Sequence, residues 1–144
     1  MSELTELPEW DDGTVAVLST GGGRPHAIPV STGVRAGPQR VLIALALRRE
    51  SLARLREEPR CALTIMGAGN VALTAHATAS ILQDPMEVSD KVAAVCLDVE
   101  DIQDHTQPRF EIESPVKWRW CELEARERDS AIRAALTELA EQHE

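Results

Sequence analysis

The stretch Thr14-Val-Ala-Val-Leu-Ser-Thr-Gly-Gly-Gly-Arg-Pro-His-Ala-Ile-Pro-Val-Ser-Thr32 begins the regular structure of this chain. Its first part, up to Thr20, is rich in β-branched residues and ends at three glycines, which predicts a strand followed by a turn. Residues 24–32 predict a second strand. Because Pro25 and Pro29 have no N–H to donate, this strand is expected at a sheet edge or with a bulge.

The same reading continues along the chain. Residues 40–47 form an apolar strand that is expected to be buried on both faces or to close a barrel. Leu52 and Leu55 share one face of a short helix over residues 50–58, which Pro59 limits. An amphipathic helix is predicted over residues 124–142. Further strands are predicted over residues 60–66, 70–82, 92–102 and 115–123.

The strands over residues 92–102 and 115–123 are predicted on separate grounds. Residues 91–102 fit either a helix or a strand, and we favour a strand from Val92. For residues 115–123, the alternation of Val116, Trp118 and Trp120 with polar side chains indicates a strand. The chain therefore predicts a mainly β (α+β) fold in one domain, residues 1–144. Its core is a small antiparallel barrel of six to seven strands with a short internal helix and a C-terminal helix, behind an acidic leader (1–12).

Composition excludes several classes of protein. The longest apolar run, Val41–Leu47, has seven residues, far below the roughly 20 that a membrane span needs. The acidic N-terminus does not resemble a secretory signal. Three widely spaced cysteines without a Cys-x-x-Cys pair favour free thiols in a reducing compartment over disulfides or zinc. We expect a cytoplasmic protein that does not bind membranes.

Charge is distributed unevenly along the chain. The net charge is −9, yet residues 13–60 carry eight arginines and only three glutamates. An acidic chain argues against binding of a nucleic-acid duplex, which requires a broad basic face. It does not exclude a small ligand with a phosphate, since two or three well-placed donors hold such a group.

The familiar catalytic and metal-binding patterns are absent from the sequence. The glycines at 21–23 lack the lysine and hydroxyl of a phosphate-binding loop. The four histidines are scattered, and we predict no metal site. No pair of residues stands out as a general acid and base, so the catalytic residues are unknown. In an enzyme of this kind, a cofactor would supply the chemistry.

One cluster of residues predicts an anion site. Arg48, Arg49 and Ser51 fall where the strand over residues 40–47 meets the short helix, and Arg54 follows one turn later. A helix start offers free N–H groups and a partial positive charge. The alternative is that these are solvated helix charges, with Ser51 as an ordinary N-cap.

Three stretches, in the same order, resemble the pyridoxamine 5′-phosphate oxidase-like, FMN-binding split-barrel superfamily. The first is residues 15–30, with a glycine turn before Arg-Pro-His and a later Pro-Val. The second is residues 40–60, an apolar strand followed by a helix that ends in Pro-Arg. The third is the strand over residues 71–81. The resemblance covers roughly residues 4–124.

This resemblance implies a homodimer of split barrels with FMN, or the deazaflavin coenzyme F-420, in a groove at the dimer interface. The ring would rest on two strands, at Pro29, Val30 and Ser31 and at Ile43, Ala44 and Leu45. The phosphate would be held by Arg48, Arg49, Ser51 and Arg54. Trp118, Arg119 and Trp120 would reach the partner's cofactor.

The chain also departs from the pattern of that superfamily. Ser51 and Arg54 stand where many members have lysine and asparagine, and the C-terminal helix replaces the Arg-Leu-x-Pro tail of the true oxidases. We therefore do not expect vitamin B6 oxidation. The resemblance implies an FMN-binding oxidoreductase that transfers a hydride to or from a small conjugated substrate. The alternatives are an F-420-dependent reductase and a non-catalytic module that binds flavin or haem.

Overall fold

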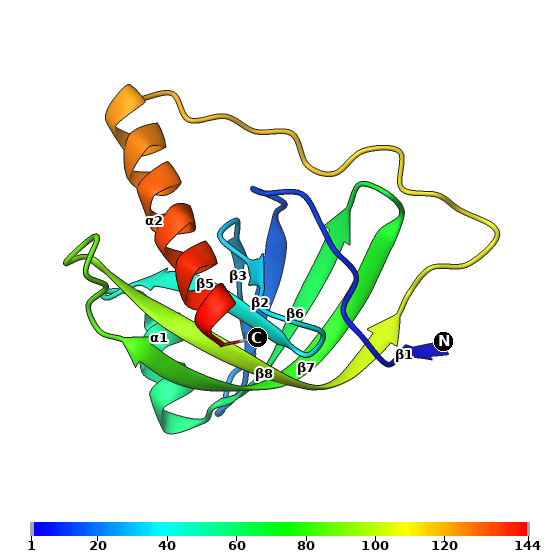
Figure 1. Cartoon of the computed structure of the whole chain (residues 1–144). Coiled ribbons are helices and arrows are strands. Elements are labelled where there is room, and N and C mark those ends of the chain that lie inside the picture. Colours follow the sequence, from blue (N-terminus) through cyan, green and yellow to red (C-terminus); the bar gives the residue numbers. More distant parts are fainter. Residues whose placement is uncertain (1, 144) are drawn as a thin grey trace.

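A computed structural model describes residues 2–143 as one curled antiparallel sheet of eight strands with two helices (Figure 1). The strands are β1 (Ser2–Leu4), β2 (Ala16–Thr20), β3 (His26–Val30), β4 (Val34–Arg35), β5 (Arg40–Ala46), β6 (Arg60–Gly67), β7 (Val71–Gln83) and β8 (Val92–Asp104). The helices are α1 (Glu50–Glu57) and α2 (Leu123–Gln142). The strand order is β3-β2-β6-β7-β8-β5-β4, and β1 pairs with β8.

The predicted split-barrel architecture with two helices is confirmed. The strands predicted between residues 14 and 102 are all present, and β3 lies at one end of the sheet, as expected for a strand that contains Pro29. Val92 does begin a strand rather than a helix. The sequence did not indicate β1 and β4, which have three and two residues and are too short to show alternation. They raise the number of strands to eight.

The predicted strand over residues 115–123 is wrong. Residues 105–122 instead form a long irregular connection that arches from β8 to the start of α2 (Figure 1). The alternation of the tryptophans with charged residues is real, but no described strand pairs with this segment. A strand needs a neighbour to satisfy its backbone, so alternation alone was insufficient.

The acidic leader is part of the barrel. Leu7 is 2% exposed and packs in the core, where its N–H donates to the carbonyl of Pro38 at 2.8 Å. The indole N–H of Trp10 donates to the carbonyl of Gly33 at 3.0 Å. These contacts hold the N-terminal segment against residues 33–38.

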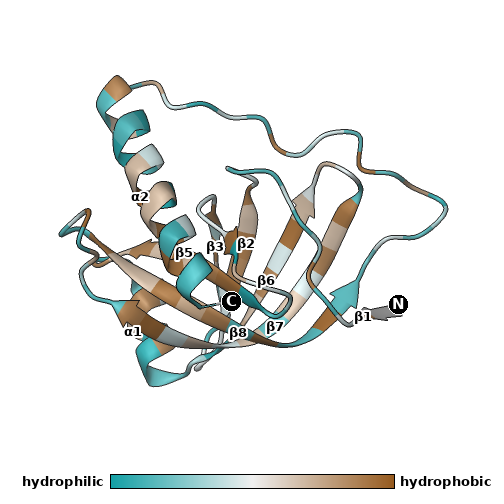
Figure 2. Cartoon of the chain, in the orientation of Figure 1, coloured by the Kyte–Doolittle hydropathy of each residue, from teal (hydrophilic) through white to brown (hydrophobic). Residues whose placement is uncertain are grey.

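Two apolar clusters lie on opposite faces of the sheet. The inner cluster fills the barrel with side chains from β2, β5, β6, β7, β8 and α1, and includes Leu18, Ile43, Leu63 and Leu97. The outer cluster joins Leu42, Ala94 and Cys96 to Leu136 and Ala140 of α2. Because both faces of β5 and of the first half of β8 are covered, hydrophobic residues follow one another there, as Figure 2 shows in brown. No helix within residues 2–143 is long and apolar enough to cross a membrane.

The barrel closes through one bent segment of chain. β3 pairs with β2, whereas β4, which follows after residues 31–33, pairs with β5 at the opposite end of the sheet. The two ends of the sheet are therefore joined covalently. β3 and the end of β5 are left facing each other without a strand ladder between them.

We predict that α2 is held to the sheet mainly by Leu136, which is fully buried. Leu136→Ala is expected to lower the free energy of unfolding by about 2–5 kcal/mol, measured by urea denaturation. Glu127→Ala, at an exposed position of the same helix, serves as the control. Its effect should stay within about 0.5 kcal/mol, and equal losses in the two variants would contradict the docking of α2.

Candidate functional site

The split of the barrel is fixed by the hydroxyl of Thr32. Its Oγ1 accepts a hydrogen bond from the N–H of Ala44 at 3.0 Å and donates to the carbonyl of the same residue at 3.3 Å. Thr32 thus contacts β5 two residues beyond the last β4–β5 pair, which is Val34 with Leu42. Beyond Ala44 the strands β3 and β5 diverge, and each presents an edge to the space between them.

That space is a cavity of about 260 Å³, which we call the β3/β5 groove. Its lining residues are Ile28, Pro29, Val30, Ser31, Thr32, Ala44, Leu45, Ala46, Arg49, Val92, Trp120 and Asp129. Since side chains alternate along a strand, Pro29 and Ala44 face outward, whereas Val30 and Leu45 point into the barrel core. The floor of the groove is therefore made of small outward side chains and strand backbone.

The residues predicted to carry a ring are placed unevenly. Pro29, Ser31 and Ala44 line the groove with outward positions. Val30 and Leu45 line it, although their side chains belong to the core. Ile43 is fully buried in the core and does not line the groove.

The four residues predicted to hold a phosphate are divided between two places. Arg49 lines the β3/β5 groove, and Arg48 lines an adjoining cavity. Ser51 and Arg54 lie on the side of α1 that faces the β2–β3 turn, outside both cavities. Ser51 is fully buried, with its Oγ 3.2 Å from Nε2 of His26.

Arg54 is engaged in a network that holds α1 against the β2–β3 hairpin. Its guanidinium donates to Oε2 of Glu50 at 3.1 Å and to the carbonyl of Arg24 at 2.7 Å. The same Glu50 oxygen lies 3.0 Å from Nδ1 of His26. The N-cap of α1 is Arg49, without a side-chain hydrogen bond, so Ser51 is not the N-cap considered above. The phosphate roles of Ser51 and Arg54 stay predictions, although both side chains have partners within the chain.

The adjoining cavity, which we call the basic pocket, has a volume of about 310 Å³. It is lined by Arg48, Ser89, Lys91, Val92, Trp120, Ala125, Arg128, Asp129 and Ile132. Val92, Trp120 and Asp129 line both cavities, so the pocket and the groove share a wall. Sequence reasoning did not identify Lys91, Arg128 or Asp129 as site residues, because they meet Arg48 only through the sheet register and the docking of α2.

Asp129 is a buried carboxylate in the shared wall. Its side chain is 7% exposed, and Oδ2 lies 2.5 Å from the guanidinium of Arg133, one helical turn along α2. The two groups are in ionic contact, but no hydrogen bond of good geometry reaches Oδ2. Asp129 is therefore charge-compensated while retaining capacity to accept a hydrogen bond.

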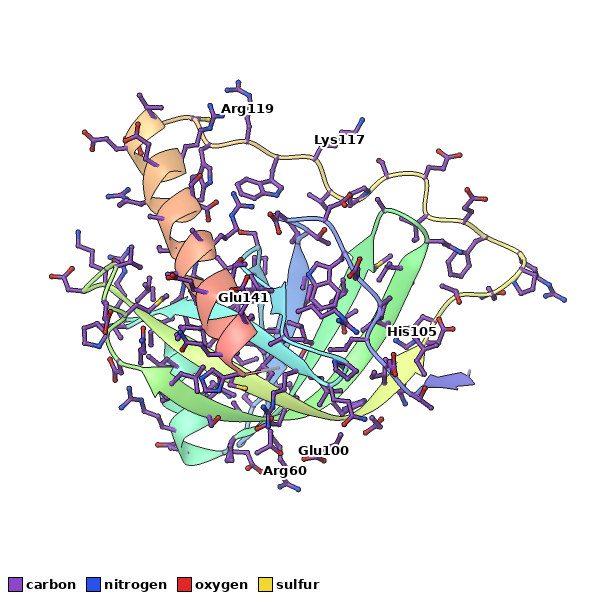
Figure 3. All side chains as sticks on the ribbon, viewed as in Figure 1. Arg60, Glu100, His105, Lys117, Arg119 and Glu141 are labelled. Carbon is purple, nitrogen blue, oxygen red and sulfur yellow. The ribbon has the colours of Figure 1, made fainter. Side chains whose placement is uncertain are left out.

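Trp118 and Arg119 lie away from the groove of their own chain. Both line a separate cavity of about 780 Å³ between residues 11–14, residues 115–120 and α2. The indole of Trp118 donates to the carbonyl of Gly13 at 2.9 Å and packs edge-to-face against Trp120, with centroids 5.4 Å apart. Figure 3 shows Lys117 and Arg119 pointing away from the barrel. A contact of Trp118 and Arg119 with a partner's cofactor stays a prediction.

The ionisable sulfur groups give no evidence of a reactive site. Burial raises the pKa of the Cys61 thiol to about 11, and burial also raises the pKa of Cys96. Cys121 is exposed in the connection before α2. Within residues 2–143, no three His, Cys, Asp or Glu side chains are grouped as metal ligands would be.

Comparisons with known proteins identify the fold. No family model matches the chain, and no curated protein matches its sequence. A Lactobacillus delbrueckii protein, provisionally assigned as a pyridoxamine 5′-phosphate oxidase, matches with a TM-score of 0.58 and 17% identity, covering 71% of this chain and 98% of that one. An F-420 reductase matches with a TM-score of 0.57 and 12% identity, covering 67% and 98%. A flavin reductase matches with a TM-score of 0.52 and 13% identity, covering 66% and 81%.

We predict that the three thiols differ sharply in reactivity. At pH 8, one equivalent of a thiol reagent such as DTNB should react with the native protein, at Cys121, because Cys61 and Cys96 are buried and protonated. Unfolding should release all three cysteines. Cys121→Ser should abolish the rapid reaction, and a native protein that loses two or more thiols at once would contradict the burial.

The identities between this chain and the matched structures are 12–17%, so the structural matches show a shared fold and nothing about activity. The first two of these matches each cover 98% of the other chain. The chain therefore has the same split-barrel fold as these structures.

Proposed function

We propose that this chain binds FMN in the β3/β5 groove and acts as an oxidoreductase, with coenzyme F-420 as the alternative cofactor. The observation that carries this proposal is the groove itself, which opens where the strand ladder ends at Ala44 and is flanked by Arg49. The structural likeness to flavin and F-420 reductases supports the same class of ligand.

The residues that line the groove fit a flat, anionic cofactor. Small outward groups at Pro29 and Ala44 leave room for a ring against the strand edges, whose backbone groups are hydrogen-bond donors and acceptors. Trp120, 41% exposed, offers an aromatic face at the wall. Asp129 supplies an acceptor for a ring N–H, and Arg49 a positive charge for the anionic part.

In this proposal the cofactor and the protein have different roles. A bound flavin or deazaflavin supplies the transfer of two electrons and a proton as hydride. The chain positions the ring on β3 and β5, neutralises the anionic tail and keeps water away with the apolar groups of Val92 and Trp120. A small conjugated substrate would enter from the open side of the groove, where it would exchange the hydride with the cofactor.

The proposal is tested by an absorbance spectrum of the purified protein and by parallel titrations with FMN and F-420. Micromolar binding of either cofactor is the expected result and identifies the cofactor class. Reduction by a reduced nicotinamide or deazaflavin donor then tests catalysis. A cofactor that binds but is not reduced by either donor would favour the non-catalytic module, and binding of neither would overturn the proposal.

A substitution at the groove floor gives a sharper test. Ala44→Leu places a branched side chain where the ring would lie, and we expect FMN affinity to fall by roughly tenfold or more, equivalent to about 1.4 kcal/mol. The matched control is Ala62→Leu on β6, outside the groove, which should leave the affinity unchanged. Isothermal titration measures both, and equal affinities for the two variants would contradict this placement of the ring.

We propose further that a second copy of this chain completes the site. Large apolar side chains are exposed along the connection and at the start of α2, and such a group is typical of an interface. They are Phe110, Val116, Trp118, Trp120 and Leu123, each between 38% and 67% exposed.

Sedimentation velocity tests this assembly. The wild-type chain is expected to sediment as a dimer, and Val116→Asp, at a position 65% exposed, is expected to shift it towards monomer. Val88→Asp, at a 43% exposed position between β7 and β8, is the control and should not change the oligomeric state. A monomeric wild-type protein would refute the dimer.

A further inference from the structure

We propose that the basic pocket is a phosphate-binding subsite, in which Arg48, Lys91 and Arg128 hold the terminal phosphate of the ligand in the neighbouring groove. The inference rests on the proposed function, because it takes that ligand to be a flavin with its ring between β3 and β5. The proposed phosphate site lies where the β5–α1 turn, the β7–β8 loop and α2 meet, and not at the start of α1.

The backbone holds two of the three cations at neighbouring positions. The ladder of β5 and β8 ends with Ala46 opposite Val92. One step further, the N–H of Leu47 donates to the carbonyl of Lys91 at 3.0 Å. Arg48 is the next residue after Leu47, so the sheet register brings Arg48 and Lys91 to the rim of one pocket. Like charges at such positions repel each other unless an anion lies between them.

α2 supplies the third cation and orients it toward the same pocket. Ala125 and Asp129 are buried on the side of the helix that faces the sheet. Arg128 lies beside Asp129 in the sequence and lines the pocket while remaining exposed. The pocket thus receives one basic side chain from each of three separate parts of the chain.

These cations are not neutralised by carboxylates. Across residues 2–143, no ion pair within 4.0 Å involves Arg48, Lys91 or Arg128. The chain as a whole has 24 acidic and 15 basic residues, so acidic partners are not scarce. The one carboxylate in the lining, Asp129, is compensated by Arg133. The pocket therefore keeps a net positive charge.

The pocket also has the means to bind an anion tightly. Val92, Trp120 and Ile132 give it apolar walls, which lower the local dielectric constant and strengthen charge interactions. The hydroxyl of Ser89 accepts the N–H of Lys91 at 3.3 Å and has its own proton to donate. A ligand with its ring in the groove reaches this pocket across the shared wall formed by Val92, Trp120 and Asp129.

The start of α1 is less suitable for an anion. The carboxylate of Glu50 already lies there and contacts both His26 and Arg54. Ser51 is fully buried, with its hydroxyl directed at His26. A phosphate at this position would meet a fixed negative charge and donors that are already in use.

Paired titrations with FMN and riboflavin test the subsite, because the two ligands differ only in the phosphate. Wild type should prefer FMN by roughly tenfold or more, as a charge-assisted contact requires. In Lys91→Ala/Arg128→Ala, FMN affinity should fall to that of riboflavin, while riboflavin affinity stays constant. The control is Arg126→Ala on the same helix, which lines the other cavity and should keep the preference. An unchanged preference for FMN in the double variant would overturn the inference and leave the proposed function intact.

A second probe separates the subsite from flavin binding. Inorganic pyrophosphate should raise the melting temperature of wild type above that in sodium chloride of equal ionic strength, and this increase should vanish in the double variant. If neither FMN nor F-420 binds but the pyrophosphate effect depends on Lys91 and Arg128, the proposed function fails and the anion site stands. If pyrophosphate, FMN and F-420 all leave wild type unchanged, both proposals fail. All three side chains are exposed, and thermal unfolding of each variant checks that it folds.

Discussion

The two hydrogen bonds between Thr32 and the backbone of Ala44 mark the point on which the site depends. On one side of this point the chain pairs with β5 through β4, and on the other it turns away through β3 to pair with β2. One bent segment thus closes the barrel and leaves it split. Had the ladder continued past Ala44, the strand edges would have satisfied each other and no groove would remain.

The basic residues around this split fall into two groups with different tasks. The guanidinium of Arg54 is bound to the carboxylate of Glu50 and to two carbonyls of the β2–β3 turn. Together with His26 and Ser51, Arg54 holds α1 to the hairpin. The second group is Arg48, Arg49, Lys91 and Arg128. Within residues 2–143 these side chains form no ion pair within 4.0 Å, and they line the groove and the pocket beside it. The difference arises because Arg48 and Arg49 precede the first turn of α1, whereas Ser51 and Arg54 share the helix face that packs inward.

Much of the barrel was predictable from local patterns. Strands β2, β3, β5, β6, β7 and β8 were predicted from β-branched runs, glycine turns and alternation, and α1 from the spacing of Leu52 and Leu55 before Pro59. The same alternation failed at Trp118 and Trp120. Pairing is a property of two segments, and no described strand lies beside residues 115–122. The short strands β1 and β4 were missed for the opposite reason, since pairing forms them without any local pattern.

The sequence by itself determined the class of fold and the cluster of arginines after the third long strand, because these depend on neighbours along the chain. Only the tertiary structure decided which cations share a pocket. Lys91 and Arg128 join Arg48 through the register of β5 with β8 and through the docking of α2 by Leu136 and Ala140. Asp129 enters the groove wall by the same docking. Contacts of this kind depend on packing between segments that are distant in the sequence, so the spacing of residues along the chain does not predict them.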